Sequence, residues 1–327
     1  MSNVAQIVRD NILQRLEDAE RTGEIFHWVK PFSFDAPDTA YSYDTLQPYR
    51  GINRLLLDNS EFLTYNKIQE LNKEKDSPQY QIRKGSHSHI VCYYNTRPII
   101  DEETGKPKVD EFTGEELKQG FLKYYRVFSR EDVIRKDNGD NLPSRFNFTH
   151  YSHEEISQQM QDAVDRFNRL FNYYCETHGI TVEVVNDGTE AYFSSDMKIR
   201  VPHISNFESC YHWVHTLAHE MAHSTGVFLN RFSGQTTREE YSKEELVAEI
   251  TAEIITKEMH IPFDEIAPDN SIAYIQSWSK YLKDNKPNEI ISAGAKAEQA
   301  VALIMECLRE MEHTAPEHTQ MEQEEER

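Results

Sequence analysis

The chain has few of the residues that mark several common protein classes. It has only 4 cysteines in 327 residues, with no C-x-x-C pair, which excludes a disulfide scaffold and fits a reducing compartment. Its 12 glycines and 12 prolines are too few for a collagenous or low-complexity protein. No apolar run approaches the roughly 18 residues of a membrane helix, and no secretory signal follows Met1. We therefore expect a cytoplasmic protein without a membrane partner.

Basic residues are also scarce. The 35 Lys and Arg against 56 Asp and Glu give a formal net charge of −21, which argues against a nucleic-acid partner because phosphates need cations. The deficit is uneven, since residues 1–150 have a net charge of −3 and residues 151–327 have −18. Residues 41–99 carry 8 basic and 6 acidic residues together with eight aromatic side chains. Such interleaving suits an unpaired nucleic-acid strand, and an ordinary aromatic core explains it equally.

Hydrophobic periodicity predicts an α+β protein in two parts. In the first part we expect helices over 3–21 and within 51–72, a hairpin of 80–84 with 89–94, a loop over 99–119 and a strand over 121–128. In the second part we expect short strands at 180–185, 191–193 and 199–201 among helices over 153–177, 207–225, 242–259, 271–284 and 290–310. The turn-rich stretch around Asn138-Gly139 and Pro143 divides a small α+β domain, 1–145, from a mainly helical domain with a small sheet, 150–308. Residues 309–327 form an acidic tail that we expect to be disordered.

One motif carries recognisable chemistry. His219-Glu220-Met221-Ala222-His223 is an H-E-x-x-H, and positions four apart lie on one face of a helix, so both imidazoles can bind one Zn²⁺. Glu220 is then the general base toward water in such a site. The alternative is a helix that simply contains two histidines.

Zinc needs a third protein ligand, and the metzincin position is occupied by Leu229, which excludes that class. The helix that follows offers Glu245 and Glu249, four residues apart on one face. We assign Glu245 as the ligand and Glu249 as the residue that supports a ligating histidine, with the reversed roles as the fallback. The alternative is a solvated acidic helix start, which the helix dipole favours. Tyr241, one turn earlier, can donate to a developing oxyanion or can serve packing alone.

These segments together resemble a known family. Residues 49–57 (YRGINRLLL), 82–85 (IRKG) and 125–128 (YRVF) resemble the N-terminal domain of the ArdC antirestriction proteins. Residues 217–226 (LAHEMAHSTG) and 241–249 (YSKEELVAE) resemble that family's zincin-like domain. The order and spacing fit over roughly residues 5–305.

The resemblance implies a single-stranded-DNA-binding domain joined to a SprT-like metallopeptidase domain, in a protein of plasmids or integrative elements that protects incoming DNA during conjugation. It implies a site of His219, His223 and Glu245, with Glu220 as the catalytic acid/base and Zn²⁺, Mn²⁺ or Co²⁺ as the metal. The DNA contacts that it implies are Tyr49, Arg50, Asn53, Arg83, Lys84 and Arg126.

Three functions remain open at this stage. The first is an antirestriction protein that binds single-stranded DNA. The second is a DNA-associated zinc peptidase that cuts a host restriction protein or another DNA-bound protein, and the third is a zinc-stabilised DNA-binding protein without turnover. The sequence indicates neither a protein substrate nor an oligomeric state.

Overall fold

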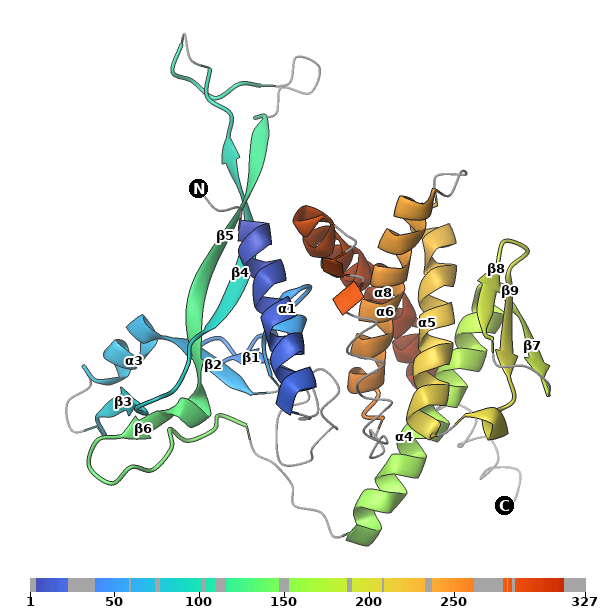
Figure 1. The fold of residues 1–327 in the computed structure, drawn as a ribbon, viewed down its shortest axis with the longest axis horizontal. Helices are drawn as coiled ribbons and strands as arrows, with labels where there is room; N and C mark the ends of the chain where they lie inside the picture. The colour runs from blue at the N-terminus through green and yellow to red at the C-terminus, as the bar shows by residue number, and fades with distance from the viewer. Residues whose placement is uncertain are drawn as a thin grey trace, which may run out of the picture.

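The protein combines a sheet-rich N-terminal half with a mainly helical C-terminal half, which confirms the α+β class (Figure 1). The structure is a computed structural model. It describes residues 4–22, 39–58, 60–73, 77–101, 104–109, 116–146, 153–186, 190–207, 209–232, 237–261, 279–280, 282–283 and 286–314. Among these residues, no helix is both long and apolar enough to cross a bilayer.

A four-stranded sheet organises the N-terminal half, in the order β1-β2-β5-β4. The short β1 (Tyr41–Ser42) runs parallel to β2 (Glu61–Thr64), whereas β5 (Lys118–Ser129) is antiparallel to both β2 and β4 (His89–Pro98). The helices packed around it are α1 (Val4–Thr22), α2 (Asn53–Leu56) and α3 (Tyr65–Leu71). Strands β4 and β5 continue past their neighbours as a long hairpin that projects from the body, which we call the arm (Figure 1).

Strand pairing differs from the sequence-based expectation in two places. The predicted hairpin of 80–84 with 89–94 is wrong, because β3 (Tyr80–Ile82) pairs with β6 (Val133–Arg135) while β4 pairs with β5. The stretch 51–72 also contains the strand β2 between its two helices. Strand β2 contains only two apolar residues, Phe62 and Leu63, so periodicity does not reveal its type, and its partners β1 and β5 lie far away in the chain.

The predicted loop over 99–119 is partly wrong as well. Strand β5 already begins at Lys118, and the backbone N–H of Ile99 donates to the Leu117 carbonyl at 2.8 Å. The N–H of Lys108 donates to the Ile99 carbonyl at 2.7 Å, so chain segments continue to pair beyond the ends of the two strands.

Four helices and a small sheet make up the described C-terminal half. The helices are α4 (His153–Thr177), α5 (Cys210–Phe228), α6 (Arg238–Glu258) and α8 (Pro287–Thr314), and the sheet has β9 (Lys198–Pro202) between β7 (Thr181–Val185) and β8 (Tyr192–Ser194). Helix α6 begins four residues before the predicted 242, because Thr237 and Glu240 form a capping box there. The predicted helix over 271–284 lies mostly outside the described residues.

The two halves share one hydrophobic core. Val8, Ile12 and Leu16 of α1 are fully buried in a cluster that also contains Ile90 of β4 and Ala297 of α8. This core crosses the predicted division at 145–150, and the division itself stays a prediction.

A polar contact joins the halves beside this core. The guanidinium of Arg54 on α2 lies 2.8 Å from Glu258 of α6 and 2.8 Å from Glu298 of α8, and the Gly51 N–H donates to Glu298 at 2.8 Å. Gly294 of α8 faces this turn so closely that a Cβ there would lie 2.7 Å from the Ile52 nitrogen. The halves thus meet through a backbone contact that only glycine permits.

The predicted tail begins later than residue 309. Helix α8 continues to Thr314, where Met311 still packs against the core and Arg166 lies 2.6 Å from Glu312. Because Met311 still packs against the core, the helix continues beyond its predicted end at residue 310. Residues 315–327 lie outside the described residues.

We expect Arg54→Ala to lower the free energy of unfolding by about 2–4 kcal/mol, because it leaves two partly buried carboxylates without their cation. Arg50→Ala is the matched control, since Arg50 is exposed four residues earlier, and we expect a change within about 0.5 kcal/mol. Urea denaturation measures both variants. Equal destabilisation by the two substitutions would contradict the idea that the contacts of Arg54 with Glu258 and Glu298 stabilise the junction of the two halves.

Only one of the four thiols should react in the folded protein. Burial raises the pKa of Cys92 and Cys307 to about 11 and that of Cys175 to about 12, whereas Cys210 is exposed at the start of α5. Thiolate is the reactive form, so at pH 8 we expect Ellman's reagent to titrate one thiol in the native protein and all four in guanidinium. The Cys210→Ser variant should show none while folded; a second fast thiol would contradict this assignment.

Candidate metal centre

Helix α5 presents both histidines of the motif on one face. Ser209 caps the helix by accepting from the His212 N–H, and Val214, Leu217 and Met221 anchor it in the core. The four-residue spacing then places the Nε2 atoms of His219 and His223 3.1 Å apart. Both side chains remain 15–18% exposed, so their nitrogens are accessible from a cavity.

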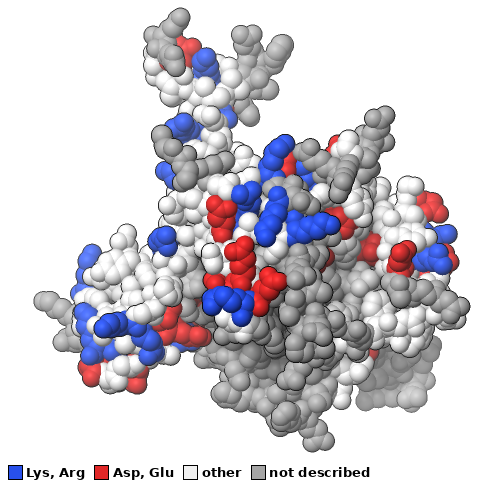
Figure 2. Space-filling view, viewed as in Figure 1, with Lys and Arg blue, Asp and Glu red and all other residues white. Residues whose placement is uncertain are grey.

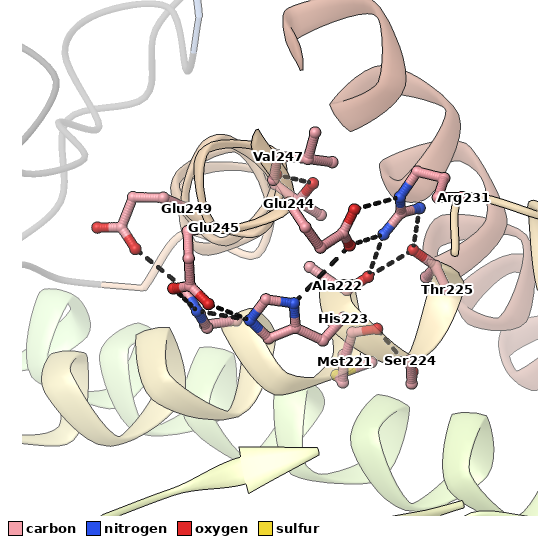
Figure 3. Close-up of polar contacts among 12 residues, drawn as sticks. Met221, Ala222, His223, Ser224, Thr225, Arg231, Glu244, Glu245, Val247 and Glu249 are labelled. Carbon is pink, nitrogen blue, oxygen red and sulfur yellow. Dashed lines mark hydrogen bonds and ion pairs between the residues drawn. The ribbon is translucent and has the colours of Figure 1, made fainter. Parts of the chain in front are cut away.

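Glu245 on α6 faces both imidazoles. Its carboxylate oxygens lie 3.5 Å from His219 Nε2 and 3.4 Å from His223 Nε2, as Figure 3 shows for His223. Ligand atoms from these three residues lie within 4.8 Å of one another. Two imidazole nitrogens and one carboxylate oxygen are a donor set that zinc sites use when the fourth position stays open, so the residues fit a divalent transition metal.

Each imidazole has a carboxylate at its other nitrogen. Glu249 Oε2 lies 3.0 Å from His219 Nδ1, which points that Nδ1–H away from the centre and turns Nε2 toward it. Glu244 Oε1 lies 3.7 Å from His223 Nδ1, and Arg231 holds Glu244 by contacts of 2.6 and 3.1 Å (Figure 3). The geometry thus favours Glu245 rather than Glu249 as the third ligand, an assignment that stays a prediction.

Arg231 and the role of Glu244 were missed from the sequence. Arg231 also donates to the Ala222 carbonyl at 2.7 Å and to Thr225 Oγ1 at 2.8 Å, so it ties the end of α5 to the start of α6. Nothing in the spacing of Arg231 indicated this, because it lies in the connection between the helices.

Carboxylates control the protonation of the histidines. Burial lowers the pKa of His219, but its hydrogen bonds to Glu245 and Glu249 outweigh burial and raise the pKa to about 10. Burial likewise opposes ionisation of Glu245, and the two imidazoles overcome it and lower the pKa of that carboxyl. A metal ion must therefore displace a proton from His219 when it binds.

Glu220 differs from the other acids of the site. Its side chain is buried, its Oε2 has no hydrogen-bond partner among the described residues, and burial raises its pKa. The backbone N–H of Phe193 on β8 and the two histidines partly offset this rise. A buried carboxylate with a raised pKa and an unused oxygen is suited to accept a proton.

A cavity of about 560 Å³ opens over these groups. Its walls come from β8, α5, the connection after α5, α6 and Lys296 of α8. Tyr241 lines it and is 59% exposed, a position compatible with either of the roles considered for it.

The six predicted DNA contacts do not share one environment. Asn53 exchanges two hydrogen bonds of 2.8 Å with the Cys92 backbone, and Tyr49 is half-buried with its ring 6.4 Å from that of Phe62, so both are occupied within the fold. The other four are exposed on three elements: Arg50 before α2, Arg83 and Lys84 after β3, and Arg126 on β5. Arg83 donates to Asn141 and Arg126 to Ser88.

The pair of histidines on α5 faces a glutamate on α6 beside a small sheet, within a segment that is similar to a zincin-like metallopeptidase family. Residues 172–296 match the family model of that name, a family that implies a metal. Residues 2–128 match the model of the N-terminal domain of anti-restriction factor ArdC. The chain therefore has the ArdC domain composition, which confirms the resemblance seen in the sequence.

Solved structures of one such protein are similar along the whole chain. The metal-free crystal structure of the antirestriction ArdC protein from the R388 plasmid has a TM-score of 0.60 and 27% identity, and its Mn(II)-bound structure has 0.58 and 25%. Each match covers 94% of this chain and 98% of that one.

Two curated relatives are DNA primase TraC proteins of Escherichia coli. They are 28% identical over 316 residues and 26% identical over 308 residues. The matches cover 91% and 90% of this chain but only 27% and 19% of the relatives, so the chain spans about a quarter of their length or less.

Proposed function

We propose that this protein is an antirestriction protein of a conjugative or mobile element, which binds single-stranded DNA through its N-terminal half and a divalent metal through its C-terminal half. The observation that carries the proposal is the match to the R388 ArdC protein, which spans both halves and 98% of that chain. The two TraC relatives, which this chain matches over only part of their length, are DNA primases by name and so also belong to DNA metabolism.

His219, His223 and Glu245 would hold the metal, with Glu249 and Glu244 orienting the imidazoles. We propose Zn²⁺, with Mn²⁺ or Co²⁺ as alternatives, because nitrogen and carboxylate donors accept all three and the R388 structure holds Mn(II). When bound, the metal would supply Lewis acidity toward a carbonyl group and toward water.

A transfer assay tests the antirestriction function. A plasmid carrying this gene is moved by conjugation into recipients with and without a restriction system, and the same plasmid without the gene is the control. We expect the gene to raise transfer only into the restricting recipient. Equal transfer of both plasmids into that recipient would contradict the proposal.

A DNA-associated metallopeptidase is the second candidate, and the unpartnered Oε2 of Glu220 in the cavity wall, alone among the described acids of the site, favours it. In this function Glu220 accepts a proton at that oxygen from the water whose oxygen attacks the peptide carbonyl carbon, and it passes the proton to the amine that leaves when the C–N bond breaks, while the cavity holds the peptide. Its substrate would be a host restriction protein or another protein bound to DNA, in the cytoplasm.

A further inference from the structure

The two strands of the arm, without the tip that connects them, have a net charge opposite to that of the whole chain. These strands, β4 of ten residues and β5 of twelve, contain no Asp or Glu and four basic residues, Arg97, Lys118, Lys123 and Arg126. The chain as a whole has a net charge of −21. In Figure 2, Lys and Arg side chains appear along the arm, and acidic residues appear only near its tip.

One face of the arm alternates aromatic rings with two of these cations, Arg97 and Lys123, whereas Lys118 and Arg126 lie on the opposite face. Residues paired across antiparallel strands share a face, and every second pair returns to it. The register places four pairs on this surface, which we call the ring face: Val91 with Tyr125, Tyr93 with Lys123, Asn95 with Phe121, and Arg97 with Gln119.

The side chains of the ring face contact one another along the arm. The rings of Tyr93 and Tyr125 have centroids 5.9 Å apart. Lys123 Nζ lies 5.1 Å from the centroid of Phe121, and the Arg97 guanidinium carbon lies 5.9 Å from it. Tyr, Lys, Phe and Arg thus succeed one another from the base of the arm outward.

These rings are not explained as core. Tyr93 is 40% exposed and Tyr125 is 38% exposed, and neither they nor Phe121 join the hydrophobic clusters of the described residues. The half-buried Tyr49 of the body lies beside Tyr125, the first ring of the face. Rings that stay exposed next to cations are the combination that stacks unpaired bases while neutralising phosphates.

We propose that the ring face is the track for single-stranded DNA, with bases stacked on Tyr125, Tyr93 and Phe121 and phosphates paired with Lys123 and Arg97. The proposal rests on the DNA-binding function above and adds its site. Unpaired bases offer free faces to aromatic rings, whereas the bases of a duplex are stacked on each other. The two strands themselves contain no carboxylate that would repel the phosphates lying along them.

The opposite face of the arm provides a matched control. It carries Tyr94, which is 70% exposed and lies against Gly120, so closely that a Cβ on Gly120 would meet the Tyr94 ring at 2.7 Å or less. Tyr94 is therefore an exposed aromatic residue of the same strand as Tyr93, on the other side of it. Replacing Tyr94 therefore tests whether DNA binding depends on the ring face or on exposed aromatic residues in general.

The full-length protein is titrated against a fluorescent oligothymidine, single-stranded or annealed to oligoadenine, over a series of salt concentrations. We expect Phe121→Ala and Tyr93→Ala each to weaken single-strand binding by about 5- to 100-fold, since one stacked base contributes about 1–3 kcal/mol. Tyr93→Phe should retain binding, and Tyr94→Ala should change it less than twofold. Arg97→Gln with Lys123→Gln should reduce the slope of log K against log salt by about 1.4.

Failure of the track and failure of DNA binding give different results. If the unchanged protein binds the single strand and the ring-face variants bind equally well, or if Tyr94→Ala is as damaging as Tyr93→Ala, the track is wrong while DNA binding stands. Equal binding of the duplex would also overturn stacking as the basis of recognition. If the unchanged protein binds no single strand at low salt, the proposed DNA-binding function itself is overturned. Far-ultraviolet circular dichroism confirms that each variant is folded.

Discussion

Glu220→Gln is expected to lower protein cleavage by about 10²- to 10⁴-fold while metal content and single-stranded DNA binding stay unchanged. Glutamine keeps the size of the side chain but cannot accept a proton at the position where Glu220 Oε2 has no hydrogen-bond partner among the described residues. Glu220 does not belong to the three residues whose ligand atoms converge, so its replacement leaves the donor set intact.

Cleavage of fluorescently labelled casein by the zinc-loaded protein, with and without oligothymidine, provides the measurement. Glu240→Gln is the matched control, because Glu240 lines the same cavity but serves the capping box of α6, and we expect cleavage within twofold of the parent. A Glu220→Gln variant that cleaves as fast as the parent would refute the assigned role. A parent that cleaves no better than its metal-stripped form would refute the peptidase and leave a metal site without turnover.

Glu245→Ala is expected to weaken Zn²⁺ or Co²⁺ binding by more than 100-fold, because it removes one of three donor atoms. Glu249→Gln should weaken binding by about 10- to 100-fold, the usual effect of losing a partner that only orients a ligand. The expected order follows from the distances, since Glu245 faces both Nε2 atoms whereas Glu249 faces His219 Nδ1.

Competition with a chromophoric chelator measures the two affinities, and Glu240→Gln again serves as the control. The opposite order, with Glu249→Gln the more damaging, would establish the reversed roles that the sequence left open. Equal, small effects of both would show that the acids at the start of α6 are a solvated helix face.

The sequence could bring the candidate metal-binding residues together because the information that it used is local, and their assignment as a metal centre stays a prediction. A four-residue spacing on a helix determines which side chains share a face, so the sequence alone could pair His219 with His223, and Glu245 with Glu249. The contact of the two helices was the only long-range assumption. The role of Arg231 was not predicted, because its partners depend on how the connection after α5 folds back, and periodicity does not encode this.

The fold of the N-terminal half was harder to predict from the sequence, because it depends on contacts between distant segments. Its strands pair across long separations, for example Tyr80 with Arg135, and short apolar runs do not specify their partners. Asn53 shows the same limit for single residues. Its amide satisfies the Cys92 backbone, a role that the motif around it does not reveal. The net charge of the whole chain also gave no information about single strands, because which side chains of β4 and β5 share a face is known only from their register.

The close approach at Gly294 has a geometric consequence. The arm rises from the half that contributes Ile52, and α8, which contributes Gly294, also lends Lys296 to the cavity wall two residues later. Together with the shared core and the Arg54 contacts, this close approach fixes the base of the arm relative to the cavity among the described residues. A strand lying along the arm would be held at a fixed reach from Glu220. The position of a protein on that strand, rather than its amino-acid sequence, would then decide whether it is cut.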